Sequence, residues 1–457
     1  MVPDPILRPA KTLAEIDFTL GDQPLLSRDQ QKAFYSAEYE KARGSGQVGQ
    51  LKFRLGASFG KKPFHAFVLG HPGVGKSTEI SRLLLDLQDR YMPIRISAAS
   101  ELYPREIRIQ DLLWLMIVRM LEVTTSPAIM GFSYDLSPGL LNDVKREMSE
   151  TVVKHLGINT AEVQAGISAS LLFRIRAAFK IQRERKEETT EYTYSRLSTL
   201  LELVNRVFDE CNGYLKNERQ REWVIVAEDF EKLGVDADSL GRLFFDYRLL
   251  FEQLTTSLLL VVPVELVYSQ DAERMPFGLQ RQFMIPDMAV MDRGHEPNAA
   301  GIDAMLSALE LRMVSSLLEP GLARKLVIAS GGNLRTLFDL VARSAINAQI
   351  RTGSRIELSD AAEAVQDLRF KYKQRLGENS FDRDEALDSE TKLTKLYDVY
   401  QGQPNSQFAD RALYLLLRHR MVLQHNGEGW FGIHPIAVDL LKQAGKLPAD
   451  APGGTDF

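Results

Sequence analysis

Residues 70–78, GHPGVGKST, combine three spaced glycines with a lysine and two hydroxyl side chains. The glycines let the backbone curl so that several N–H groups face one anion. Lys76 can then reach the β- and γ-phosphates of a nucleotide, and Ser77 can ligate Mg²⁺. The pattern predicts a site for ATP or ADP with Mg²⁺. The loop residues predicted to contact the nucleotide are Gly70, His71, Pro72, Gly73, Val74, Gly75, Lys76, Ser77 and Thr78.

Two acids, Glu228 and Asp229, follow the apolar run WVIVA at residues 223–227. One carboxylate at the end of a buried strand can hold Mg²⁺ through water, while the next orients or deprotonates the attacking water. An acidic strand end that faces solvent is the alternative, but a phosphate loop needs an acidic partner. We predict that Ser77 and Glu228 bind the metal and that Lys76, Glu228 and Asp229 serve catalysis.

A third motif, GGNLR at residues 331–335, opens a predicted helix far along the chain. An arginine at that position can reach a γ-phosphate across a domain cleft, which would couple the nucleotide state to the angle between domains. We predict that Arg335 contacts the nucleotide and contributes to catalysis. An exposed helix arginine with no ligand is the alternative.

These motifs are separated by apolar runs that alternate with helical patterns, which predicts a parallel sheet covered by helices on both faces. The predicted strands are residues 65–69, 93–98, 223–227, 258–266 and 282–290. Helices are predicted at 28–41, 78–89, 301–317, 334–349, 389–400, 408–419 and 436–443. Asn426-Gly427 between apolar runs predicts a hairpin, so the last elements suggest a winged helix.

The fold class predicted from this order is α/β, with a helical lid and a C-terminal winged helix after the sheet. The predicted domains are an N-terminal strap and helix (1–40), an ATPase domain (41–295), a helical lid (296–380), a winged helix (381–446) and a disordered tail (447–457). An inserted arm at about 130–215 interrupts the ATPase domain.

Within the arm, every odd-numbered residue from Val163 to Ile181 is apolar, which favours a β-like stretch at 161–182. A helix is the alternative, because some of these residues also lie four apart, although one glycine and two serines weaken it. A cationic run overlaps the arm, and a solvated stalk is favoured over phosphate-backbone binding. Its members are Arg174, Arg176, Lys180, Arg183, Arg185 and Lys186.

The bulk properties point to the cytoplasm. The formal net charge is −5, so the chain as a whole has no pull toward nucleic acid or acidic lipid. The N-terminal segment lacks the apolar core of a signal peptide, and the apolar run 257–267 is too short to span a bilayer. The single cysteine, Cys211, fits a reducing compartment. No membrane role is expected.

The segment GHPGVGKSTEI resembles the Walker A sequence GxxGxGKSTEL of uncharacterised bacterial ATPases in the AAA+/STAND group of P-loop ATPases, close to the initiator-like branch. The resemblance extends over residues 26–441. It implies an ATPase with a lid and a winged helix, and GGNLR resembles the sensor-2 motif. The stretch GIHPIAVDLL resembles the part of STAND proteins where a histidine touches the ADP β-phosphate, which would be His434. A buried core histidine is the alternative.

The sequence departs from this family in two places. Glu228 stands where an aspartate is usual, and a longer carboxylate implies a shifted metal and slow turnover. Pro263 and Glu265 occupy the region of the sensor-1 residue, so no sensor-1 is assigned. Relatives often complete the site with an arginine from a neighbouring subunit, and Arg274 and Arg281 are the candidates here.

Three functions remain open from the sequence. The favoured one is a nucleotide switch that recruits a protein partner or another copy of the chain, and the resemblance suggests signalling or defence. A DNA-loaded initiator or transposition-type ATPase is the main alternative, although residues 408–444 carry only four cations, Arg411, Arg418, Arg420 and Lys442. The third is a nucleotide-binding scaffold that hydrolyses nothing.

Overall fold

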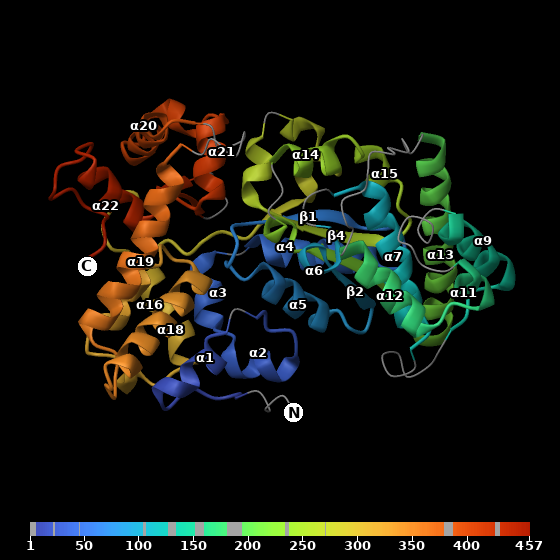
Figure 1. The fold of residues 1–457 in the computed structure, drawn as a ribbon, viewed down its shortest axis with the longest axis horizontal. Helices are drawn as coiled ribbons and strands as arrows, with labels where there is room; N and C mark the ends of the chain where they lie inside the picture. The colour runs from blue at the N-terminus through green and yellow to red at the C-terminus, as the bar shows by residue number, and fades with distance from the viewer. Residues whose placement is uncertain are drawn as a thin grey trace.

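The computed structural model describes residues 6–21, 23–44, 46–103, 107–126, 134–150, 160–180, 194–233, 237–269, 271–378, 387–425 and 430–457. A central sheet with its covering helices forms one part of the molecule, and a mostly helical part lies beside it (Figure 1). The described ranges contain no helix that is both long enough and apolar enough to cross a membrane.

The sheet is parallel, with strands in the order β2-β3-β4-β1-β5. The strands are β1 (His65–Leu69), β2 (Tyr91–Ser97), β3 (Glu222–Glu228), β4 (Ser257–Val262) and β5 (Gln282–Met284). Alternate residues of a strand point to opposite faces. In β1, Ala66 and Val68 enter one core, whereas Phe67 and Leu69 enter the other. Both faces are therefore buried, as a parallel sheet requires.

Two strands are shorter than their sequence patterns predicted. The run 258–266 stops being a strand at Val262, because Pro263 has no N–H to give to a neighbouring strand, and Val264–Tyr268 form a 3₁₀ helix. The run 282–290 contributes only the three residues of β5, which lies at the edge of the sheet. The chain after β5 leads to the lid.

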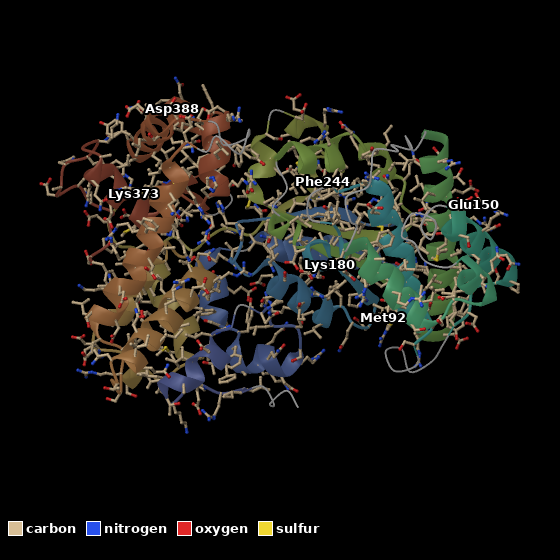
Figure 2. The ribbon with its side chains drawn as sticks, in the orientation of Figure 1. Met92, Glu150, Lys180, Phe244, Lys373 and Asp388 are labelled. Atoms are coloured by element: carbon tan, nitrogen blue, oxygen red, sulfur yellow. The ribbon has the colours of Figure 1, made fainter. Side chains whose placement is uncertain are left out.

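Helices cover both faces of the sheet. Apolar residues of α4 (Gly46–Ser58) and α5 (Lys76–Asp86) pack on one face. On the other face lie α7 (Ile109–Thr124), α13 (Tyr194–Arg219) and α14 (Ala237–Phe245). Figure 2 shows Phe244 of α14 over the sheet, where its side chain is fully buried, whereas Glu150 and Lys180 lie on the outside. Two short helices, α6 (Ala98–Glu101) and α15 (Arg248–Glu252), lie in connections between strands.

The inserted arm is helical, so the predicted β-like stretch 161–182 is wrong over its described residues. The arm contains α9 (Pro138–Met148), α11 (Thr160–Ala165) and α12 (Ala169–Lys180). Leu171, Ile175 and Phe179 lie four apart and are buried together with Leu172, which a strand would turn to the opposite face. Apolar residues in this stretch recur both every two and every four residues, so the sequence fits a strand and a helix alike. Packing against the rest of the core favours the helix. Arg183, Arg185 and Lys186 lie outside the described residues.

The N-terminal segment is a strap with α1 (Ile16–Thr19), α2 (Arg28–Phe34) and α3 (Ala37–Arg43). The single helix predicted at 28–41 is thus two helices. Tyr35 is extended, and the Ser36 hydroxyl accepts a hydrogen bond from the N–H of Tyr39 to start a new helix. Buried strap residues join the core of the lid, so the strap connects the sheet side to the lid.

The lid and the winged helix share one core. The lid contains α16 (Ala299–Glu310), α17 (Leu322–Ala329), α18 (Leu334–Ile350) and α19 (Leu358–Leu376). Residues 330–333 separate α17 from α18. The winged helix contains α20 (Ser389–Tyr400), α21 (Arg411–Arg418), β6 (Val422–His425), β7 (Trp430–Ile433) and α22 (Pro435–Gln443). β6 and β7 pair as a hairpin, whose predicted turn at Asn426-Gly427 lies outside the described residues.

The C-terminal tail is ordered, which corrects the prediction of disorder at 447–457. The Thr455 N–H donates to Asp439 Oδ1 at 3.1 Å. The Lys325 ammonium donates to the Asp456 carbonyl at 3.2 Å and lies over the Phe457 ring. The small and polar residues of the tail are typical of a disordered segment, which is why the sequence predicts disorder. Phe457 and the polar contacts above hold the tail against the lid and α22. The α/β P-loop fold with helical lid and winged helix is otherwise confirmed.

Candidate functional site

The glycine loop runs from the end of β1 to the start of α5, and its backbone explains its glycines. Gly73 has φ +87° and Gly75 has φ +92°, in the left-handed region that other residues rarely adopt. A Cβ on Gly73 would also come within 2.6 Å of Arg335 Cβ. The loop therefore needs glycine for its curvature and for the close approach of the lid.

Lys76 folds back over this loop. Its ammonium donates hydrogen bonds to the carbonyl oxygens of Gly70 at 2.8 Å and His71 at 3.0 Å, and its side chain is 5% exposed. The same nitrogen lies 3.7 Å from Glu231 Oε1. A nucleotide phosphate can replace the two neutral carbonyl partners with a charged one, which makes a stronger hydrogen bond.

The acids after β3 are held in different ways. Glu228 Oε1 accepts a hydrogen bond from Arg95 Nη1 at 2.6 Å, whereas Glu228 Oε2 is buried and has no hydrogen-bond partner among the described residues. Asp229 has φ +67°, and its carboxylate accepts from Ser97 Oγ at 2.8 Å and pairs with Lys232 at 2.7 Å. Partial burial pulls the pKa of Asp229 upward, but these two partners leave it lowered, so the group stays ionised.

Glu231 is a site residue that the sequence reasoning missed. It follows Glu228 by three residues, on a 3₁₀ turn (Phe230–Lys232) that brings it back toward the loop. Its Oε2 is buried and finds no hydrogen-bond partner in the part of the chain that the structure describes. The sequence shows Glu231 as the third acid of the run EDFE at residues 228–231. That this acid lies near Lys76 could not be predicted, because its position depends on the 3₁₀ turn.

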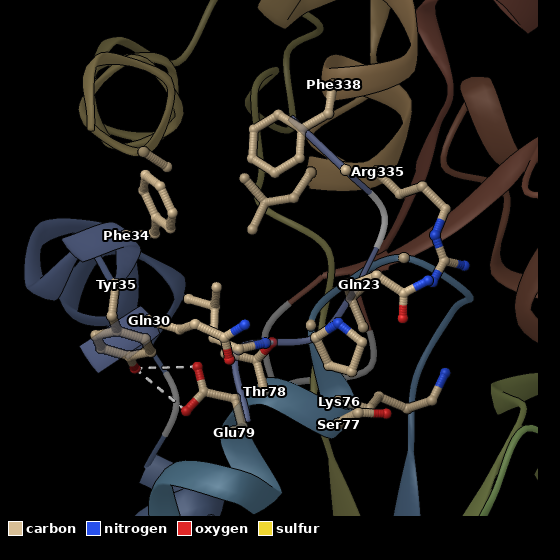
Figure 3. A pocket seen from close by; sticks show the side chains of 18 of the residues that line it. Gln23, Gln30, Phe34, Tyr35, Lys76, Ser77, Thr78, Glu79, Arg335 and Phe338 are labelled. Carbon is tan, nitrogen blue, oxygen red and sulfur yellow. Dashed lines mark hydrogen bonds between the residues drawn. The ribbon is translucent and has the colours of Figure 1, made fainter. Parts of the chain in front are cut away.

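These groups line a cavity of about 430 Å³. The loop contributes residues 73–79, β3 and its turn contribute the three acids, and the lid contributes Arg335 and Phe338. The strap closes the remaining side with Gln23, Phe34 and Tyr35, among others. Figure 3 shows Arg335 and Phe338 across the cavity from Lys76 and Ser77, with Tyr35 hydrogen-bonded to Glu79.

The structure brings most of the predicted site residues together. Those that line the cavity are Gly73, Val74, Gly75, Lys76, Ser77, Thr78, Glu228, Asp229 and Arg335. Gly70, His71 and Pro72 lie just before this lining, and the His71 ring turns toward Asp287, with Nε2 at 3.8 Å from Oδ2. The arginine-finger candidates lie elsewhere: Arg274 pairs with Asp246 at 2.7 Å, and Arg281 lies over the Phe64 ring.

His434 is fully buried at the junction of lid and winged helix rather than in the cavity. Its Nδ1 accepts a hydrogen bond from the Ile436 N–H, and its ring packs on Tyr372 with centroids 4.8 Å apart. A Cβ on Gly331 would come within 2.3 Å of this ring. In this arrangement His434 packs as a core histidine, which was the alternative that the sequence left open.

The lid contacts the loop directly through Asn333, which precedes α18. The Asn333 amide donates to the Pro72 carbonyl at 3.0 Å and to Asp287 Oδ1 at 2.9 Å, while its oxygen caps the helix. Burial raises the pKa of Asp287 to about 6. The Asp287 N–H in turn donates to the Gln424 carbonyl of β6. Loop, lid and winged helix thus meet at one buried polar junction.

The site fits a magnesium–nucleotide complex by its own chemistry. Glu228 and Glu231 each have one oxygen without a partner among the described residues, and these oxygens and the Ser77 hydroxyl are of the kind that Mg²⁺ prefers. The loop N–H groups at the start of α5 and the Lys76 ammonium suit a polyphosphate.

Under the loop lies a buried ion pair that supports it. Arg43 Nη1 donates to the Val74 carbonyl at 2.9 Å, and Arg43 Nη2 pairs with Glu79. Both side chains are nearly inaccessible, at 1% and 3% exposure. Arg43→Ala is expected to lower the free energy of unfolding by up to about 3–5 kcal/mol, because the buried Glu79 keeps only the partly exposed Arg82 at 3.4 Å and the Tyr35 hydroxyl.

Denaturant unfolding measures this loss. Arg248→Ala is the matched control, since Arg248 pairs with Glu252 at 2.9 Å on the surface, where such a pair contributes about 0–1 kcal/mol. Equal losses in the two variants would show that the Arg43 pair has no special role.

Comparisons with known proteins find similar solved structures only, at low sequence identity. No protein-family model matches the chain, and no curated protein matches it. Among solved structures, Cdc6p from Pyrobaculum aerophilum is similar with a TM-score of 0.38 and 12% identity, over 94% of this chain and 98% of that one. The Walker-type ATPase PABY2304 of Pyrococcus abyssi gives 0.41 and 12%, over 93% and 99%. The RuvB Holliday junction branch migration motor of Thermotoga maritima gives 0.31 and 13%, over 91% and 97%.

Proposed function

We propose that the chain is an AAA+/STAND-like ATPase that binds ATP with Mg²⁺ and hydrolyses it slowly to ADP and phosphate. The observation that carries this proposal is one cavity that gathers Lys76, the carboxylates of Glu228, Asp229 and Glu231, and Arg335 of the lid. Lys76 and the loop N–H groups bind the phosphates, Ser77 and Glu228 hold the metal, and Arg335 approaches the γ-phosphate from the lid.

Asp229 is the proposed base that orients the attacking water. Its hydrogen bonds to Ser97 and Lys232 keep the carboxylate ionised and fixed, which is what a water-orienting group requires. Glu231 faces Lys76 and balances its charge in the absence of phosphate. Phe34 and Tyr35 of the strap line the same cavity, and we propose that they contact the nucleobase.

We infer that the output is a change in the lid and winged helix. Asn333 joins the loop to the lid, and Asp287 joins both to β6, so a nucleotide that moves the loop alters all three contacts. The surfaces released would recruit a protein partner or a second copy of the chain. A cytoplasmic role in signalling or defence is the proposed setting, and it follows from composition and family resemblance.

Replacing Asp229 by asparagine tests hydrolysis directly. The Asp229→Asn variant is expected to lose about 100-fold or more in steady-state ATP turnover, because general-base catalysis contributes about 10²–10⁴. Nucleotide affinity should change little, since the loop and Lys76 remain. Release of phosphate and binding of a fluorescent nucleotide measure the two quantities.

The exposed Asp86→Asn variant serves as the control, because Asp86 pairs with Lys52 on the surface of α5. Equal, measurable turnover in wild type and Asp229→Asn would show that Asp229 is not the base. Turnover absent from wild type with binding intact would favour the scaffold that hydrolyses nothing.

DNA loading, the other alternative, has no observation of its own among the described residues, and we do not propose it. Of the four cations of the winged-helix region, Arg420 faces inward and donates to Thr336 Oγ1 of the lid at 2.6 Å. Arg420 therefore belongs to the junction between lid and winged helix, and its guanidinium does not point outward to where a DNA backbone would bind.

A further inference from the structure

Arg95 is a strand residue that touches both sides of the proposed metal site without lining the cavity. It lies in β2, next to β3 in the sheet. Its Nη1 donates to Glu228 Oε1 at 2.6 Å, and its Nη2 donates to Ser81 Oγ at 2.6 Å. Ser81 lies one helical turn after Ser77, whose carbonyl accepts a hydrogen bond from the Ser81 hydroxyl at 2.7 Å. One guanidinium therefore links the carboxylate of β3 to the turn that carries the metal-binding hydroxyl.

The two oxygens of Glu228 have different surroundings. Oε1 is occupied by Arg95, and Oε2 is buried with no partner in the described ranges, although Glu228 lines the cavity. A buried carboxylate oxygen without a partner is costly unless a ligand completes it. The arginine and a metal, or a metal-bound water, can use separate oxygens of one carboxylate, so they do not compete for the same position.

A glutamate needs this help more than an aspartate would. Its side chain has one more rotatable bond, so fixing one oxygen toward the cavity costs more conformational entropy. The planar Arg95 guanidinium donates hydrogen bonds to Glu228 Oε1 and to the Ser81 hydroxyl on α5, and this restricts rotation about the additional bond of the glutamate. This accounts for a glutamate in a place where a shorter acid would reach the metal without support.

We infer that Arg95 is the positioning residue of the magnesium site: it holds Glu228 so that Oε2 faces the metal bound with the nucleotide. The inference rests on the proposed function, because the metal enters with ATP or ADP. Arg95 acts through Glu228 and, by way of Ser81, keeps the turn of Ser77 at a fixed distance from it.

Titration of Mn²⁺ into the ADP-bound protein tests the inference, with protein in excess and free Mn²⁺ followed by electron paramagnetic resonance. Arg95→Met is expected to weaken metal binding by about 10- to 100-fold, the usual effect of removing a group that orients a metal ligand. ADP affinity in EDTA should change little, since the side-chain hydrogen bonds of Arg95 go to Glu228 and Ser81 and not to the glycine loop.

Three further variants separate positioning from a merely structural role. Arg95→Lys keeps the charge but cannot grip two partners, so it should restore part of the metal affinity. Ser81→Ala leaves the Arg95–Glu228 pair in place, and should show a smaller loss in the same direction. In a Glu228→Gln background, Arg95→Met should cause no further loss, because the two changes remove one interaction.

The opposite results overturn the inference. Unchanged metal affinity in Arg95→Met would show that Glu228 needs no positioning, and tighter binding would show that Arg95 blocks the metal. Either result leaves the proposed ATPase intact if wild type binds ADP and Mn²⁺. If wild type binds no nucleotide, the proposed function and this inference fail together.

Discussion

Lys76→Ala is expected to weaken ATP binding by about 10- to 100-fold and to remove measurable turnover. The ammonium would otherwise make a charge-assisted hydrogen bond to the phosphates, which contributes about 1.5–3 kcal/mol, or about one to two powers of ten in a dissociation constant. In the structure this nitrogen is already aimed into the loop by the carbonyl oxygens of Gly70 and His71. Isothermal titration with ATP and a phosphate-release assay measure the two losses.

Lys52→Ala is the matched control for this experiment. Lys52 is an exposed lysine of α4 that pairs with Asp86 at 2.6 Å, so its loss should change neither affinity nor turnover. ATP affinity that is equal in wild type and Lys76→Ala would remove the proposed nucleotide site. The roles assigned to Glu228 and Arg95 would then lose their basis as well.

The glycine loop and the two acids after β3 could be predicted because their chemistry is local. The curvature of the loop depends on glycines at fixed spacing. A short, fully apolar run such as WVIVA is typical of a buried strand, which is what the structure shows in β3. The strand ends therefore had to bring Ser77 and Glu228 to the same edge of a parallel sheet. The lid motif could be placed for a similar reason, because Asn333 and Arg335 mark the start of a helix.

The rest of the site depends on contacts between distant parts of the chain. Arg95 and Glu228 are 133 residues apart, and nothing in either local sequence indicates that they form a pair. Glu231 reaches Lys76 only because Asp229 adopts a left-handed backbone. The helical arm was misjudged because its apolar spacing fits two periods, and the choice between them was made by packing against α7.

The winged-helix junction contains buried histidines, so its stability is expected to fall in acid. Burial lowers the pKa of His425 to about 4, and burial together with the nearby Arg420 charge lowers the pKa of His434 to about 3. A group whose pKa is lower in the folded protein contributes stability that is complete above its ordinary pKa of 6.5. That stability is lost as pH falls toward the folded value, because the unfolded chain takes up the proton first.

Two neighbours change this balance in opposite directions. Burial raises the pKa of Asp287 to about 6, so the folded protein takes up that proton earlier and gains stability as pH falls from 6 toward 4. Burial and the neighbouring cations hold the pKa of His71 well below its ordinary value, which adds to the loss. Between pH 6 and 4 the unfolded chain takes up protons on His425 and His434, whereas the folded protein takes up one on Asp287. The unfolded chain therefore binds about one proton more than the folded protein, even without His71. These three groups should therefore lower the wild-type free energy of unfolding by about 1.4 kcal/mol per pH unit near pH 5, whereas burial of Glu265, which raises its pKa to about 7, acts in the opposite direction.

His434→Asn isolates the effect, because asparagine keeps an acceptor for the Ile436 N–H at the start of α22 and does not titrate. Urea unfolding of the variant at several pH values should show a slope that is smaller than wild type by about 1.4 kcal/mol per pH unit between pH 6 and 4. Tyr372→Phe is the control, because it alters the same packing without a titrating group in this range and should keep the wild-type slope. A wild-type slope in His434→Asn would contradict the assignment.

The same junction connects acid sensitivity to the nucleotide. His425 Nδ1 donates a hydrogen bond to the Asp287 carbonyl at 3.3 Å. The Asn333 amide donates both to the Asp287 side chain and to the Pro72 carbonyl of the loop. Protonation that loosens the winged helix therefore loosens the lid from the loop, and it should weaken ADP binding in wild type between pH 6 and 4. In His434→Asn the weakening should be smaller than in Tyr372→Phe when fluorescent ADP is titrated at each pH. If affinity follows pH equally in both variants, the winged helix is not energetically coupled to the site, and the proposed switch would need another path.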